Sequence, residues 1–197
     1  MNEAPFTQLV PLVEAIVQSL LPYLDKPFAF FGHSMGGLTS FEVARSLRRA
    51  YARGPVHLFV SGRRAPQIPN SGALIHTLPD AEFLEELRHL NGTPEAVLAN
   101  EELMQLLLPT LRADFAVLET YTYQPEALLD YPITAFGGLQ DPDVSCEMLE
   151  AWKEQTSVAF SLHMFLGDHF FIHTAQSLLL QSLNKSLVRI TSRMHCF

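Results

Sequence analysis

The chain has 197 residues, of which 48% are hydrophobic and 17% are charged. This composition excludes a disordered chain, and the length suits one domain with a single core. The formal net charge of -8 argues against nucleic-acid binding, which depends on Lys and Arg. Two cysteines, Cys146 and Cys196, are too few for a disulfide framework, and we expect both to be buried or inert thiols. No apolar run reaches the roughly 18 residues of a membrane helix, so we predict a cytoplasmic protein outside the membrane.

The first part of the chain alternates helix and strand signals. Residues 6–24 carry apolar side chains at the three- and four-residue spacing of a helix with one buried face. Residues 27–31 have no polar side chain, which is typical of a strand that is buried on both faces of a parallel sheet. Helical spacing returns from Gly37, and residues 56–62 form a second strand-like run. Strand, helix and strand in this order predict a right-handed crossover unit.

Residues 75–123 contain no convincing strand signal. Their apolar spacing predicts two or three helices, interrupted at Gly92, Pro94 and Pro109. The block stands between two regions that carry strands. We therefore expect a single domain over residues 1–197, in which 75–123 is a helical insertion and a candidate lid.

The alternation resumes after this block. Residues 132–138 predict a strand, and the segment "SCEMLEAWKEQ" predicts a helix. Residues 158–169 predict another strand, and a last helix runs from His173 to about Leu187. The whole pattern predicts an α/β fold with a mostly parallel sheet and flanking helices.

The segment Gly32-His33-Ser34-Met35-Gly36 matches G-x-S-x-G between a predicted strand and a predicted helix. In such a turn the residues two before and two after the serine approach each other, so side chains there would clash. The helix N-terminus also places backbone N–H groups near a developing oxyanion. We predict Ser34 to be a nucleophile, with an ordinary glycine turn as the alternative.

A serine nucleophile needs a base and an acid, in the chain order Ser, Asp or Glu, His. Asp141 follows the strand at 132–138, and His169 follows the next strand, so both should lie at the edge of the sheet that carries the serine. Asp143 is a rival acid, but Asp141 comes first after its strand and Pro142 stiffens the turn. His33 adjoins the serine, but we expect adjacent side chains on a sharp turn to diverge.

A metal site is the alternative for the histidines near residue 170. His169 and His173 stand four residues apart with Asp168 beside one of them. The segment lacks the Glu of H-E-x-x-H, and no third ligand is evident. We therefore expect a hydrolase without metal.

Five blocks of sequence carry a family resemblance. They are "FAFFGHSMGGLTSFEVARSLRR", "VSGRRAPQIP", "LLLPTLRADFAVLETYTY", "GGLQDPDVS" and "FLGDHFFI", in this order. Together they resemble the type II thioesterases of nonribosomal peptide and polyketide synthesis, which have the α/β-hydrolase fold. The resemblance extends from about Phe6 to about Leu187.

The resemblance implies hydrolysis of acyl thioesters on the phosphopantetheine arm of acyl or peptidyl carrier proteins, which releases stalled or misprimed synthetases. It assigns Ser34 as nucleophile, Asp141 as orienting acid and His169 as general base, with the Met35 backbone N–H as one oxyanion donor. Residues 75–123 would correspond to the family's lid. No cofactor is implied, because the phosphopantetheine belongs to the substrate. The charge of -8 predicts docking to an acidic carrier through local apolar contact, and we expect a monomer.

The start of the chain departs from the family pattern. Only 33 residues precede Ser34, and one predicted helix and one predicted strand fill them. We therefore expect an N-terminally truncated member that lacks the family's early strands and the loop with the second oxyanion donor. Two alternatives follow. One is an esterase or acyltransferase on the same scaffold, and the other is a non-catalytic remnant that binds acyl chains or a synthetase partner.

Overall fold

The structure is a computed structural model of the chain, and it describes residues 4–70, 72–90 and 92–194. The chain divides into two compact units. The helical unit comprises the residues up to Gln18 and Pro69–Gln124, and the sheet unit comprises Ser19–Ile68 and the residues from Pro125 onward. Cys146 is a free thiol, and Cys196 lies outside the described residues. None of the helices in the described ranges is long and apolar enough to cross a lipid bilayer.

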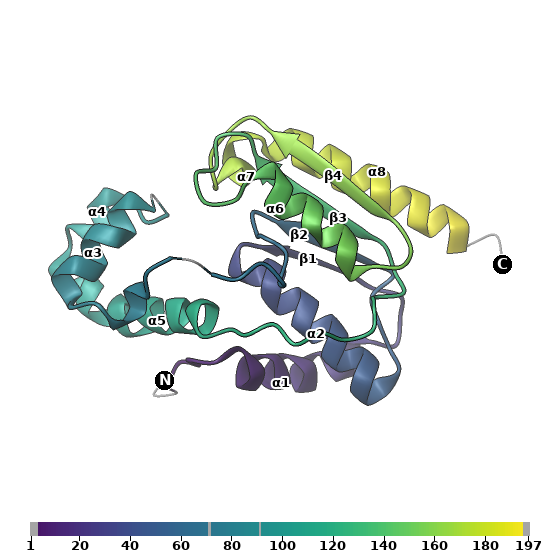
Figure 1. Cartoon of the computed structure of the whole chain (residues 1–197), viewed down its shortest axis with the longest axis horizontal. Coiled ribbons are helices and arrows are strands. Elements are labelled where there is room, and N and C mark those ends of the chain that lie inside the picture. The colour runs from purple at the N-terminus through teal and green to yellow at the C-terminus, as the bar shows by residue number, and fades with distance from the viewer. Residues whose placement is uncertain (1–3, 71, 91, 195–197) are drawn as a thin grey trace. The chain divides into compact units, whose positions relative to one another are not determined.

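The sheet unit is built on a four-stranded sheet of β1 (Ala29–His33), β2 (His57–Ser61), β3 (Ile133–Gly138) and β4 (Phe160–Phe165). The strands lie in this order and every neighbouring pair is parallel (Figure 1). The flanking helices are η1 (Leu21–Tyr23), α2 (Met35–Tyr51), α6 (Cys146–Glu150), η3 (Ala151–Gln155), α7 (Phe171–Thr174) and α8 (Gln176–Met194). This arrangement confirms the predicted parallel sheet with flanking helices.

The central strands β2 and β3 are buried along their whole length, and their successive residues point to opposite faces of the sheet. Phe136 of β3 packs with Phe59, Phe171 and Leu179, so this face lies under α7 and α8. The next position, Gly137, faces α6: a Cβ there would lie 2.2 Å from Leu149 Cδ1. The core of the unit therefore has two layers, one on each side of β2 and β3.

The first strand differs from its prediction. β1 lies at one edge of the described sheet, and Phe31 is 43% exposed. The expectation that this strand is buried on both faces is therefore wrong. An unbroken apolar run reveals a strand, but it does not reveal whether the strand has neighbours on both sides.

The helical unit contains most of α1 (Leu9–Leu20), together with η2 (Ile75–Thr77), α3 (Asp80–His89), α4 (Glu95–Leu98) and α5 (Glu101–Glu119). It has a core of its own around Phe83, Leu87, Leu98 and Met104. The predicted interruption at Pro109 is wrong, because α5 continues through this residue. A proline costs a helix interior about 3 kcal/mol, and packing of the flanking turns offsets this cost. The carboxylate of Glu119 accepts the backbone N–H groups of Ile75 and His76, which joins the two ends of this block.

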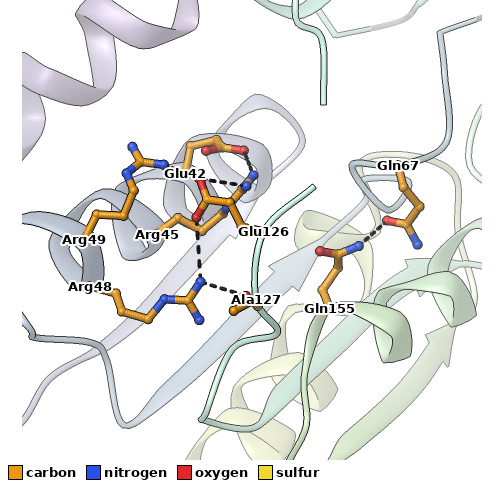
Figure 2. A network of polar contacts seen from close by, with 8 residues as sticks. All are labelled: Glu42, Arg45, Arg48, Arg49, Gln67, Glu126, Ala127 and Gln155. Carbon is orange, nitrogen blue, oxygen red and sulfur yellow. Dashed lines mark hydrogen bonds and ion pairs between the residues drawn. The ribbon is translucent and has the colours of Figure 1, made fainter. Parts of the chain in front are cut away.

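An ion-pair network fixes the chain where it re-enters the sheet unit after α5 (Figure 2). Arg45 of α2 is 2% exposed, and its guanidinium contacts Glu42 at 2.7 Å and Glu126 at 3.0 Å. Arg49 also pairs with Glu126. Arg48 donates at 2.7 Å to each of the two backbone carbonyl groups that follow Glu126. The segment that leads into β3 is thus held against α2.

Candidate active site

Ser34 stands in the turn between β1 and α2. Its φ of 51° and ψ of -116° lie in a region that residues other than glycine rarely adopt. Its N–H donates to the Ser61 carbonyl at 2.7 Å, and its own carbonyl accepts the N–H of Gly37 at 3.0 Å. A Cβ on Gly32 would lie 2.0 Å from the Gly36 carbonyl oxygen, as the clash argument predicts. A Cβ on Gly36 would meet nothing within 4 Å, so that argument is wrong for the second glycine.

Asp141 and His169 form a hydrogen-bonded pair. His169 Nδ1 lies 2.7 Å from Asp141 Oδ2, and Oδ1 of the same carboxylate accepts the backbone N–H groups of Asp143 and Val144 at 2.9 and 3.1 Å. Burial alone would raise the pKa of Asp141, but the hydrogen bonds from His169 and the two backbone groups outweigh it and hold the pKa below its usual value. Asp141 is therefore an ionised acceptor at neutral pH. Of the two candidate acids, it is Asp141 that lies beside His169.

Backbone contacts between two loops bring this pair together. Asp141 follows β3, and His169 follows β4. A Cβ on Gly138 would lie 2.2 Å from the Asp168 carbonyl oxygen, and Gly167 has a φ of 126°. Glycine is therefore required at both positions. Gly138 leaves room for the loop after β4, and Gly167 adopts a backbone conformation that side chains disfavour.

His33 lies in the site, which the sequence pattern did not predict. Its ring centroid lies 5.1 Å from that of His169, so the expectation that its side chain diverges from the site is wrong. The reason is Gly62, which has a φ of 57° directly after β2. A Cβ there would lie 2.8 Å from His33 Cε1 and 3.3 Å from His169 Cε1, so the missing side chain leaves space for both rings. A glycine directly after the neighbouring strand was the signal for this contact.

Ser61 connects His33 to Ser34. His33 Nδ1 lies 3.0 Å from Ser61 Oγ, and the carbonyl of the same Ser61 accepts the N–H of Ser34. Burial, followed by the proximity of His169, lowers the pKa of His33 to about 4. His33 is therefore neutral near pH 7, and the site contains two imidazoles of which one stays uncharged.

Ser34, Asp141 and His169 follow β1, β3 and β4. Because the strands are parallel, the three residues lie at the carboxyl ends of the strands (Figure 1). Ser34, Asp141 and His169 all belong to the sheet unit. The Met35 N–H lies in the first turn of α2, where N–H groups have no carbonyl partner within the helix. Asp168 is engaged by the N–H of Phe170 at 2.8 Å. Among the residues that the structure describes, no three His, Cys, Asp or Glu side chains gather as metal ligands would.

The chain resembles proteins of one family along most of its length. Residues 1–187 match the family model described as the thioesterase domain. The chain is 51% identical over 188 residues to linear gramicidin dehydrogenase LgrE of Brevibacillus parabrevis and 50% identical over 185 residues to gramicidin S biosynthesis protein GrsT of Aneurinibacillus migulanus. Each match covers 94% of this chain and 72% of the relative. The solved structure of the type II thioesterase BorB from the borrelidin biosynthetic cluster matches with a TM-score of 0.84 at 37% identity, covering 93% of this chain and 74% of BorB.

Proposed function

The chain belongs to the thioesterase family, in its type II branch, and from this premise we propose that it hydrolyses acyl thioesters on the phosphopantetheine arm of acyl or peptidyl carrier proteins. Members of this family are serine hydrolases with the α/β-hydrolase fold. GrsT is named for gramicidin S biosynthesis, and BorB comes from a biosynthetic cluster. These names support a role beside a synthetase, where the enzyme removes stalled or misprimed acyl groups.

The hydrogen bond between His169 and Asp141 is the observation that carries the proposed mechanism. An ionised carboxylate only accepts, so Nδ1 of His169 bears the proton and Nε2 offers a lone pair. In the proposed reaction, Nε2 takes the proton of the Ser34 hydroxyl while Oγ attacks the thioester carbonyl. The C–S bond breaks, and the imidazolium gives this proton to the departing pantetheine thiolate. His169 then deprotonates a water molecule as its oxygen attacks the acyl-serine ester, and the imidazolium returns the proton to Ser34 Oγ when the C–Oγ bond breaks and the free acid leaves.

The negative oxygen of the tetrahedral intermediate needs hydrogen-bond donors. We assign the Met35 backbone N–H as one donor, because it belongs to the first turn of α2 and the positive end of the helix dipole points the same way. The strained backbone at Ser34 supports this assignment, since the turn that strains the serine also begins the helix directly after it. Loss of one such donor typically lowers kcat by about 10² to 10³.

Two further roles are part of the proposal. Residues 75–123 act as the lid, which is supported by their independent core and by the ties between their two ends. The carrier protein docks through local apolar contacts, because a chain with a net charge of -8 gains no long-range attraction to an acidic partner. The monomeric state and the cytoplasmic location stay predictions.

The decisive experiment compares two substrates that carry the same acyl chain, an acyl-phosphopantetheinyl carrier protein and a simple oxygen ester. We expect faster hydrolysis of the carrier thioester, with equal amounts of free acid and free carrier thiol. Ser34→Ala is expected to abolish both reactions. A strong preference for the ester would favour the esterase alternative. A folded sample that a fluorophosphonate probe does not label at Ser34 would favour the non-catalytic alternative.

The name of LgrE specifies a dehydrogenase, which is a different reaction class. A dinucleotide-binding turn needs a second glycine two residues after the first, so that the backbone can approach the pyrophosphate. Here that position is Ser34, two residues after Gly32. The turn after β1 therefore suits a nucleophile better than a dinucleotide. Consumption of NADH or NADPH by the purified chain with an acyl-carrier thioester would overturn this conclusion.

A further inference from the structure

On the basis of the proposed function, we propose that His33 is a positioning residue. Its imidazole packs beside the His169 ring and keeps that ring within reach of Ser34. His33 takes no proton from the substrate in this proposal. It acts through His169, which Asp141 holds from another direction. The proposed mechanism assigns no role to this half-buried ring.

His33 is itself held firmly. Its Nδ1 lies 3.0 Å from the hydroxyl of Ser61, which is fully buried. Its ring meets Phe171 edge to face at 6.0 Å and lies 6.2 Å from the ring of Phe170. A side chain with polar and aromatic contacts on several sides has little freedom to rotate. The His33 ring can therefore serve as a rigid packing surface for the His169 ring.

The contact with His169 is made across Gly62. The two imidazole centroids are 5.1 Å apart with an angle of 49° between the ring planes. Both Cε1 atoms come within 3.3 Å of the place where a Gly62 Cβ would stand. The His169 ring therefore has a carboxylate at Nδ1 and a second ring beside it, and these two contacts together restrict its rotation.

The charge of His33 suits this position. Burial, followed by the proximity of His169, lowers the pKa of His33 to about 4, so it stays neutral while His169 accepts a proton in the proposed reaction. The titratable groups that act on His33 are His169, Asp141 and His173. A second cation beside the imidazolium would oppose its formation, whereas a neutral ring does not. In the part of the chain that the structure describes, Nε2 of His33 is buried and has no hydrogen-bond partner, so Nδ1 is the ring atom that anchors His33 by a hydrogen bond.

The test is His33→Asn, which retains a polar atom near the position of Nδ1 for Ser61 but removes the outer half of the ring. We expect kcat to fall about ten- to a hundredfold with KM within about twofold, because small displacements of a catalytic group cost this much. The matched control is His57→Gln. His57 is a buried histidine whose ring is likewise bonded to a hydroxyl, that of Thr134 at 2.9 Å, but it begins β2 at the other end of the strand. We expect its variant to keep kcat within about twofold per folded molecule.

Two further measurements separate positioning from general stability. In the first, Ser61→Ala removes the hydroxyl that orients His33, and we expect the double variant with His33→Asn to be no slower than His33→Asn alone. In the second, the downfield NMR resonance of the His169 Nδ1 proton should broaden in His33→Asn and stay sharp in His57→Gln. Unchanged kcat and an unchanged resonance in His33→Asn would overturn the proposal, and so would equal losses in the His57 control. If His33→Asn does not fold, an unchanged kcat in Ser61→Ala overturns it.

Failure of this proposal can be distinguished from failure of the proposed function. The rate at which a fluorophosphonate labels Ser34 needs no carrier substrate, and we expect it to fall in His33→Asn whatever the natural acyl donor is. If the wild-type chain is not labelled, the proposed function fails, while the His169 resonance still tests the contact with His33.

Discussion

Asp141 and His169 are joined by a hydrogen bond at the place where the backbone of Gly138 lies against the backbone of Asp168. The acid and the base thus depend on a contact that contains no side chain. Backbone atoms cannot move aside as a flexible side chain can, so this contact is sensitive to a single methyl group.

Gly138→Ala is therefore expected to damage both stability and activity. Its Cβ would stand 2.2 Å from the Asp168 carbonyl oxygen, and the loops after β3 and β4 would have to separate. We expect a loss of about 1–3 kcal/mol in the free energy of unfolding and a fall in kcat of at least about tenfold. Denaturant unfolding followed by Trp152 fluorescence measures the first, because this single Trp is buried in the sheet unit. The stability control is Gly36→Ala, whose Cβ meets nothing within 4 Å and which should be neutral or stabilising.

Asp141→Asn separates the two candidate acids. The amide can donate to Nδ1 of His169, which leaves the proton on Nε2 and removes the lone pair that the proposed base needs. We expect kcat for thioester hydrolysis to fall by about 10⁴. Asp143→Asn is the matched variant two residues away, where only the backbone N–H contacts Asp141. Comparable losses in the two variants would contradict the assignment of the acid.

The buried His57 predicts a loss of stability in mild acid. Burial lowers the pKa of His57 from 6.5 to about 4, so the unfolded chain takes up a proton at this position before the folded chain does. Its contribution to stability is complete above pH 6.5 and is lost as the pH falls from about 6.5 towards 4, with a slope below about 1.4 kcal/mol per pH unit. Across this range, the free energy of unfolding should depend less steeply on pH in His57→Gln than in the wild-type chain. Denaturant unfolding at a series of pH values measures it. Parallel pH profiles would show that His57 is not the group responsible.

Glu126→Gln tests the network that holds the chain after α5. The Arg45 side chain is 3% exposed, and its described ion pairs are with Glu42 and Glu126. After the change, Glu42 is the charged partner that remains among these pairs. We expect a loss of about 1–3 kcal/mol, again followed by Trp152 fluorescence, because a buried charge that loses a partner is costly. Asp25→Asn removes the same charge from an exposed position in the same unit and should change stability by less than about 0.5 kcal/mol. Equal effects would mean that net charge, and not the network, matters.

Much of the sheet unit could be predicted from residue patterns. Each of its four strands was located, and because the strands are parallel, residues after their ends had to share one edge. This reasoning predicted that Ser34, Asp141 and His169 lie near one another, and the structure shows the hydrogen bond between Asp141 and His169. The family and the fold follow from the same blocks of sequence and are confirmed by the comparisons.

The rest depended on contacts between distant residues. The exposure of Phe31 depends on which strands flank β1, and the continuity of α5 through Pro109 depends on the packing of its other residues. The position of the His33 ring depends on the absent side chain at Gly62, which lies on another strand's loop. Periodicity within a segment contains no information about such neighbours.

Ser61 gives the site a common support. Its carbonyl fixes the main chain of Ser34, while its hydroxyl fixes the ring that lies beside His169. Ser34 and His33 therefore share one anchor at the end of β2, and a displacement of this end moves the two residues together.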